Sequence, residues 1–233
     1  MIHDKRRATV LVFLLLAALG SVSAGDVARF VNLGFSPDSR IFMFAQHGID
    51  QTTSQPYAEI YTVNVPANDF VSRGVQRRQY PVAISPGQDG SGALYSLLPE
   101  MRPVVEQYGV SHLRQGRLVY LLVNGEEPRQ SLEFRDFESG DRYQIALNQQ
   151  ARGSGESGSA AFYLDVTVTF ANGTQVEHRV GRPGFFRSGV NEYRINRVVV
   201  APDQNSLVVV VERLADIASG TRIRYMVETV ALR

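Results

Sequence analysis

The sequence contains no cysteine, and its only lysine is Lys5. Without cysteine the chain has no thiolate nucleophile, no cysteine-type zinc site and no disulfide, so packing alone must hold it together. Without a lysine beyond Lys5 it has no Schiff-base lysine, no Ser-Lys dyad and no lysine of a phosphate-binding loop. These absences exclude several enzyme classes.

The first 24 residues follow the three-part plan of a secretory signal peptide. A basic stretch precedes an apolar run at residues 10–19, and Val22 and Ala24 occupy the small-residue positions that signal peptidase reads. The apolar run is about ten residues long, whereas a membrane-spanning helix needs roughly 20. We therefore predict a signal peptide at residues 1–24 and a mature chain, residues 25–233, with no transmembrane anchor.

Removal of residues 1–24 leaves almost no net charge. It takes away three of the 24 basic and one of the 23 acidic residues, so that 21 arginines face 22 carboxylates. A formal charge near −1 gives no electrostatic reason to expect binding of nucleic acid or of an anionic membrane. With 44% hydrophobic and 20% charged residues, the chain has the composition of a globular protein.

A strand-turn-strand pattern opens the mature chain. Residues 33–44, LGFSPDSRIFMF, are two apolar runs around a polar corner, and Pro37 presets its φ for a turn. The run before the turn alternates as in a half-buried strand, and the run after it is continuously apolar, as in a strand covered on both faces. Residues 59–65, EIYTVNV, add a third strand, so the pattern predicts a three-stranded antiparallel meander.

A second copy of this pattern lies between Tyr193 and Leu232. It reads RVVVAPDQNSLVVVVE and then IRYMVETVAL, with Tyr225 in the place of Tyr61. The unit resembles a blade of the TolB-type β-propellers, but a propeller needs at least four blades of about 40 residues, so two units cannot close a ring. The two meanders are instead candidates to pair in one sheet.

A helical segment is expected between the meanders. Residues 92–108 carry apolar side chains at helical spacing, and Gly109 follows as a C-cap. Pro99 and Pro103 should kink this segment or divide it into two short helices. Its apolar stripe is typical of core packing rather than of a ligand groove.

The remaining middle region has the period of β-strands. RLVYLLVNG reads as a buried strand with a turn, and two hairpins follow, across residues 138–141 and across Asn172-Gly173. Residues 152–159, RGSGESGS, read as a flexible loop. The predicted fold is mainly β, antiparallel and sandwich-like, with two propeller-blade-like meanders and one short helical segment. We expect a single domain at residues 25–233, with a possible internal boundary near residues 151–160.

The leader and three segments of the mature chain resemble a family of predicted secreted bacterial proteins of unknown function. The segments are LGFSPDSRIFMFAQHGIDQTTSQPYAEIYTVNV, GRPGFFRSGVNEYRINRVVVAPD and RYMVET. The resemblance implies a periplasmic or secreted location. It brings no catalytic residue to this chain.

Candidates for catalysis or metal binding are few. The mature chain has three histidines, and no pair of them has metal-ligand spacing. His47 with Asp50, in QHGID, is a weak candidate to bind a metal or to serve as a base, with His112 as a further member. The alternative is a hydrogen-bonded loop histidine, which the absence of a motif favours.

The strongest binding candidate is the loop GRPGFFRSGVNEY, in which Phe185 and Phe186 stand between Arg182 and Arg187. Large apolar side chains exposed on a loop usually contact something, although one of the two phenylalanines could fold back onto the core. The favoured hypothesis is a non-enzymatic envelope protein that binds a protein or glycan partner and needs no cofactor. The alternative is a metal-assisted hydrolase using His47 and Asp50.

Overall fold

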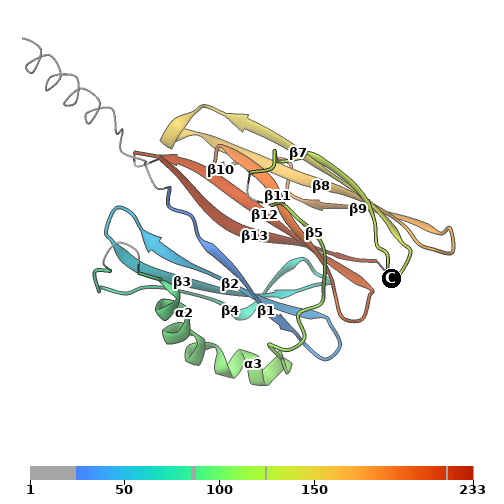
Figure 1. Cartoon of the computed structure of the whole chain (residues 1–233), viewed down its shortest axis with the longest axis horizontal. Helices are drawn as coiled ribbons and strands as arrows, with labels where there is room; N and C mark the ends of the chain where they lie inside the picture. Colours follow the sequence, from blue (N-terminus) through green and yellow to red (C-terminus); the bar gives the residue numbers. More distant parts are fainter. Residues whose placement is uncertain (1–24, 85–87, 124, 219, 233) are drawn as a thin grey trace, which may run out of the picture.

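The computed structural model describes residues 25–84, 88–123, 125–218 and 220–232 (Figure 1). The predicted signal peptide, residues 1–24, lies outside the described residues.

The described chain forms three antiparallel sheets, and the helical segment covers one of them. The N-terminal sheet has the order β1-β2-β3-β4, formed by Arg29–Phe35, Ile41–Asp50, Gln55–Asn64 and Asp69–Gln79. The central sheet has the order β13-β12-β11-β5, formed by Gly220–Ala231, Ser206–Ile217, Glu192–Val200 and Arg117–Leu121. The outer sheet has the order β10-β8-β7-β6, formed by Arg187–Ser188, Ser159–Thr169, Arg142–Arg152 and Ser131–Arg135, with β9 (Gln175–Gly181) also paired to β8. The outer, central and N-terminal sheets and the helices follow one another as layers (Figure 1).

The central sheet is buried on both faces, which explains the run of four valines in β12. Val208 and Val210 pack toward the N-terminal sheet. Val209 and Val211 pack toward the outer sheet. Because successive strand residues point to opposite faces, a strand covered on both sides needs an apolar residue at every position. Full burial of each such side chain contributes roughly 1.5–3 kcal/mol.

The N-terminal sheet is also buried on both faces, by the central sheet on one side and by the helices on the other. Phe42 and Phe44 of β2 face the central sheet. Met43 and Ala45, between them in sequence, face the helices. The predicted two-sided burial of the second strand is therefore confirmed.

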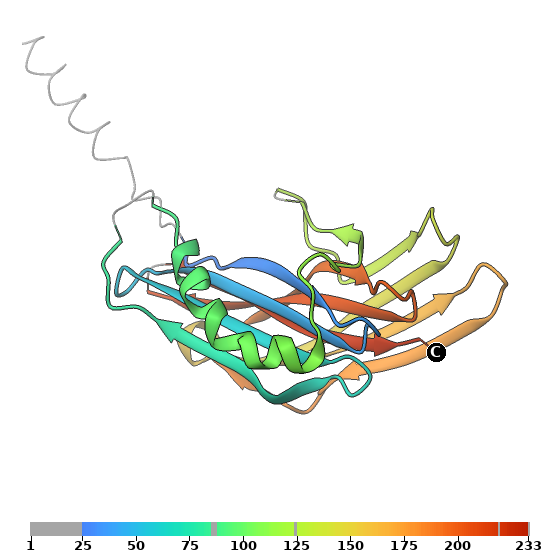
Figure 2. The same ribbon diagram turned by 90° about the horizontal axis from the view of Figure 1, so that it is seen from below.

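The helical segment is divided, as its prolines predict. It consists of α2 (Ser91–Leu97), a 3-10 turn η1 (Leu98–Met101) and α3 (Arg102–Tyr108). Pro99 and Pro103 stand at the starts of η1 and α3, where a missing N–H costs no helix bond. Gly109 ends α3 with a left-handed φ of 64°. The helical segment lies across the N-terminal sheet (Figure 2). Its buried side chains pack against that sheet, so the apolar stripe is core: Ala93, Leu94, Leu97, Met101 and Val104.

Each predicted meander forms, but the expectation that the two pair in one sheet is wrong. The first meander is β1 to β3 of the N-terminal sheet, and the second is β11 to β13 of the central sheet. They stack face to face, with Tyr61 and Tyr225 in the same core cluster. Their turns also meet, since the Asp203 backbone N–H donates to Ser39 Oγ at 3.2 Å. The described residues form stacked sheets, with no closed ring of propeller blades.

The outer edge of β13 is covered by a short backbone segment and by two side chains. Residues 26–28 pair with it at Ile223, where Ile223 N–H donates to the Asp26 carbonyl oxygen at 2.9 Å. Farther along, the Tyr225 N–H donates to Gln46 Oε1 at 2.7 Å, and the Thr229 N–H donates to Asn68 Oδ1 at 2.8 Å. An unpaired buried N–H is costly, so these two side-chain amides satisfy edge groups that no strand pairs.

Both predicted hairpins are confirmed, as β6-β7 and β8-β9.

The strand β5 differs from the expected buried strand. It forms the edge of the central sheet, and its residues Leu118 and Leu121 are exposed. Within residues 152–159, β7 and β8 still pair at Arg152 and Ser159, and a 3-10 turn η2 (Gly155–Ser157) lies between them. The single domain stays a prediction.

Candidate functional site

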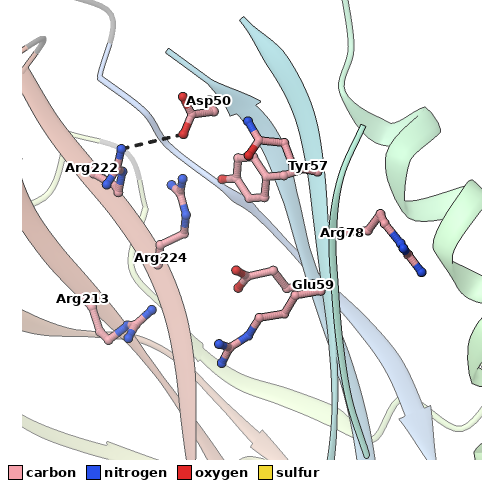
Figure 3. Close-up of a pocket in the computed structure, with 9 residues that line it drawn as sticks. Asp50, Tyr57, Glu59, Arg78, Arg213, Arg222 and Arg224 are labelled. Atoms are coloured by element: carbon pink, nitrogen blue, oxygen red, sulfur yellow. Dashed lines mark ion pairs between the residues drawn. The ribbon is translucent and has the colours of Figure 1, made fainter. Parts of the chain in front are cut away.

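A cavity of about 410 Å³ opens where the N-terminal sheet meets the central sheet (Figure 3). We call it the arginine pocket. Its walls come from β2, β3 and β4 on one side and from β12 and β13 on the other. The lining residues are Asp50, Tyr57, Glu59, Arg77, Arg78, Gln79, Arg213, Arg222 and Arg224.

One wall is fixed by a buried carboxylate just before β1. The Asp26 side chain is 0% exposed, and its Oδ2 accepts hydrogen bonds from Arg222 Nε at 2.9 Å and Arg224 Nη2 at 2.7 Å. Arg224 also lies over the Tyr57 ring, 4.3 Å from its centroid. Asp50 Oδ2 is 3.8 Å from Arg222. These contacts hold two guanidinium groups in place, since paired charges keep their geometry when partly desolvated.

The opposite wall carries a carboxylate held by neutral donors. Glu59 Oε2 accepts hydrogen bonds from Gln46 Nε2 and from the Tyr61 hydroxyl, both at 2.6 Å. Arg77 Nε donates to the same hydroxyl oxygen at 3.2 Å. Burial, with Glu59 beside it, raises the pKa of Tyr61 to about 12, so this phenol stays a neutral donor at physiological pH.

Arg213 differs from the other arginines of the pocket because its side chain has no hydrogen bond or ion pair to any residue that the structure describes. Its Nε is buried and has no hydrogen-bond partner there. Burial lowers the pKa of its guanidinium; Tyr61, Glu59 and Tyr193 act the other way, and Arg187 adds to the lowering. Leaving a buried donor unsatisfied costs free energy, so such groups in folded proteins usually have a ligand, an ion or water.

Arg78 lies beside Arg77 on β4 and lines part of the pocket, but its guanidinium is paired with a carboxylate outside it. Its Nη2 lies 2.8 Å from both carboxylate oxygens of Glu100, on η1. Its side chain is directed toward the helices and away from Arg213 and Arg224 (Figure 3). Two adjacent arginines therefore point to opposite sides of the strand, and one of them is already neutralised.

Sequence reasoning missed this pocket apart from Asp50. Its residues come from two groups of consecutive strands, β2–β4 and β12–β13, that lie far apart in the sequence. A local signal existed in β13, where Arg222 and Arg224 are two residues apart and thus share a face. Because residues 25–233 contain no lysine, all strong cationic binding there falls to arginine.

The predicted binding loop runs from the end of β9 through β10 to the start of β11, and its aromatic rings lie against arginines. Phe185 is 51% exposed. The Arg187 guanidinium lies between the rings of Phe185 and Phe162, 5.0 and 5.6 Å from their centroids. Phe186 is half-buried beneath Arg152, at 3.5 Å. Phe185 is thus the more available of the two rings, beside the exposed Arg182.

The loop and the arginine pocket are electrostatic neighbours. Arg187 is one of the charges that lower the pKa of Arg213, and Arg182 and Arg187 both act on the buried Glu228 of β13. An anionic partner would meet a positive potential over both places.

The structure does not bring the histidine candidates together. His47 shares a face of β2 with Met43 and Ala45, toward the helices, whereas Asp50 points into the arginine pocket on the other face. Burial lowers the pKa of His47, although Asp89 acts against it. His112 lies elsewhere, with its Nδ1 2.6 Å from the Leu33 carbonyl oxygen. Within the described ranges, no three potential metal ligands of the His, Cys, Asp or Glu type form a group.

Comparison with known protein families gives a match over most of the chain. A family described as "Predicted secreted protein (DUF2259)" matches residues 43–231. A search of curated proteins found no match. Among the described residues, none of the helices has the length and apolar character required to cross a bilayer.

Proposed function

Because this chain belongs to the DUF2259 family of predicted secreted proteins, we propose that it is a non-enzymatic binding protein of the cell envelope whose arginine pocket holds an acidic group of its partner. The partner is a protein or a glycan that presents a carboxylate or a similar oxyanion.

The unpartnered guanidinium of Arg213 carries this proposal. Arg222 and Arg224 are paired with carboxylates of the chain, whereas the side chain of Arg213 has no ion pair among the described residues and lines the open pocket. An oxyanion bound there would satisfy the buried donor and gain charge-assisted hydrogen bonds of about 1.5–3 kcal/mol. The planar guanidinium group of arginine suits the binding of an oxyanion, because its paired N–H donors match the geometry of carboxylates and phosphates.

The chemistry of the pocket supports binding rather than catalysis. A guanidinium stays protonated in proteins and cannot take part in proton transfer near neutral pH. Burial also raises the pKa of Tyr57 and Tyr61. With lysine and cysteine absent from residues 25–233, nucleophiles based on an amine or a thiolate are excluded.

The loop around Phe185 supplies the second part of the proposed binding surface. Arg182, Phe185, Phe186 and Arg187 are the residues concerned. An exposed aromatic ring stacked with arginine offers a flat face for a partner that extends beyond the pocket. The proposed surface therefore combines an acid-binding pocket with an aromatic contact beside it.

The test is a thermal-shift and calorimetric titration of residues 25–233 with phosphate, sulfate, acetate and D-galacturonate. At least one acid should raise the melting temperature, because a ligand that binds only the folded state stabilises it. Arg77→Ala should weaken that binding at least about tenfold, since it removes a charged donor. Arg78→Ala removes the same charge from the adjacent position and should bind as wild type does. Failure of every acid, or an equal loss in both variants, would overturn the proposal.

A further inference from the structure

No aliphatic side chain is among the residues that line the arginine pocket. All nine side chains that form it are polar or charged: five arginines, two carboxylates, a tyrosine and a glutamine. Arg224 covers the ring of the tyrosine, Tyr57. Protein partners usually insert an aromatic or aliphatic anchor into an apolar hot spot. A pocket without such a surface selects a ligand whose non-acidic part is itself hydrophilic.

The charge balance of the pocket favours a ligand with one negative charge. Five arginines line the cavity, but the charge of Arg78 is balanced by Glu100 and is left out of this count. Four guanidinium groups remain. Three carboxylates act against them: Asp26, Asp50 and Glu59. Four positive and three negative charges leave an excess of about one. A monoanion balances this excess, whereas a dianion would exceed it beside two carboxylates of the cavity wall.

Glu59 provides an acceptor that a simple anion cannot use. Both of its hydrogen bonds to described residues use Oε2, from Gln46 and Tyr61. Oε1 therefore remains able to accept a hydrogen bond from a ligand. A carboxylate repels an oxyanion but binds a hydroxyl group, so the pocket combines cationic donors with an anionic acceptor.

The size of the cavity agrees with a ligand larger than a bare ion. At about 410 Å³ it falls within the range of small-molecule sites, which is roughly 300–1,000 Å³. A single carboxylate on a hydroxyl-bearing ring meets the requirements of charge, hydrophilicity and size together.

We propose that the arginine pocket binds the acidic sugar unit of a glycan, a hexuronate, with its carboxylate on Arg213 and Arg77 and a ring hydroxyl on Glu59. This inference rests on the proposed function and narrows its partner to one class. It also gives a reason for acidic residues inside a cationic pocket.

The first measurement is isothermal titration calorimetry of residues 25–233 with D-galacturonate, D-galactose, phosphate and triglutamate. Galacturonate should bind at least tenfold more tightly than each of the other three. Galactose tests the need for the carboxylate. Phosphate, titrated above its second pKa so that it is a dianion, tests the preference for a monoanion. Triglutamate tests the alternative of an acidic protein segment.

The Glu59→Gln variant separates a hydroxyl acceptor from a merely structural residue. Glutamine retains an oxygen that can accept from Gln46 and Tyr61, but it removes the negative charge. Galacturonate binding should weaken several-fold in this variant, while phosphate binding should strengthen. If the binding of both ligands weakens together, Glu59 has only a structural role and the inference is wrong.

The outcomes distinguish the inference from the function on which it rests. Phosphate or triglutamate could bind more tightly than galacturonate, and Arg77→Ala could abolish that binding. This result would overturn the assignment of a sugar ligand but would still support an acid-binding protein. Absence of binding by all three acids would overturn both.

Discussion

Arg117 and Arg213 are both half-buried arginines of the central sheet, but their surroundings differ. Arg117, on β5, forms an ion pair with Asp136, whose side chain is 3% exposed, and its Nε lies 3.2 Å from Glu138 Oε2. The side chain of Arg213, on β12, forms no ion pair with a described carboxylate, and its buried Nε has no hydrogen-bond partner there. One arginine therefore joins the central sheet to the β6-β7 turn, and the other faces an open pocket.

This difference separates an arginine that stabilises the fold from one that we assign to binding. Asp136 accepts hydrogen bonds from Arg117, from the Glu138 N–H and from the Ser139 hydroxyl. We call this a closed cluster because Arg117 and Asp136 both have their partners within the chain. The unsatisfied Nε of Arg213 costs stability, and under our proposal a ligand supplies the missing acceptor. Sites that must bind a ligand often retain such strain, because the same group cannot be satisfied internally and remain available.

The largest expected effect is on the closed cluster. Asp136→Ala should lower the free energy of unfolding by about 3 kcal/mol, because it leaves Arg117 without its buried partner. Glu138→Ala removes the exposed partner of the same arginine and should cost under about 1 kcal/mol. Urea denaturation of both variants measures the two changes in the free energy of unfolding. If the two variants lose equal stability, burial does not decide the strength of these contacts.

The same cluster predicts sensitivity to acid. Burial alone would raise the pKa of Asp136, but Arg117, Glu138 and Ser139 lower it below 3.8 overall. A carboxyl whose pKa is lower in the folded state stabilises the fold above its unfolded pKa and loses that contribution as the pH falls through the folded value. The stability difference between wild type and Asp136→Ala should therefore shrink below pH 3.8.

Arg213→Met should have the opposite effect on stability. Removing an unpartnered buried charge while keeping an apolar stem should raise the free energy of unfolding by about 1 kcal/mol. Galacturonate binding should be lost. Arg224→Met is the matched change at an arginine that Asp26 satisfies, and it should destabilise the protein. If both variants destabilise equally, Arg213 has a structural role that the account denies.

Phe185→Ala should have the smallest effect on the fold. The side chain is largely exposed, so stability should change by less than about 0.5 kcal/mol. Binding of trigalacturonate should weaken several-fold, whereas binding of the monosaccharide should not change, because the loop contacts only what extends beyond the pocket. Phe186→Ala, beneath Arg152, should instead lower stability. Equal affinity of wild type and Phe185→Ala for trigalacturonate would remove the loop from the binding surface.

The sequence predicts the local parts of this fold well. The alternation around Pro37, the divided helix at Pro99 and Pro103 and the turn at Asn172-Gly173 all depend on short-range chemistry, and all are present. The packing of the two meanders was wrongly expected, because apolar strands with period two are compatible with pairing edge to edge or with stacking face to face. The side chains of Gln46 and Asn68 bond to the backbone of β13 and so favour stacking. These bonds join segments far apart in the sequence, so no local pattern predicts them.

The candidate site could not be predicted from local patterns. Glu59, Arg77 and Arg213 carry no motif, and they meet because two sheets stack. The missing partner of Arg213 is likewise a property of the fold rather than of any segment. His47 and Asp50, adjacent enough in sequence to suggest one site, are separated because residues three apart on a strand face opposite sides.

The most direct test of the central claim observes Arg213 itself. In the ¹H–¹⁵N spectrum of arginine Nε groups, the Arg213 signal is assigned by its absence in Arg213→Met. Addition of D-galacturonate should shift this signal in a saturable way, with the same Kd as calorimetry gives, while the Arg117 signal stays fixed. If galacturonate binds and the Arg213 signal does not move, the acid lies elsewhere and the arginine pocket is not the binding site.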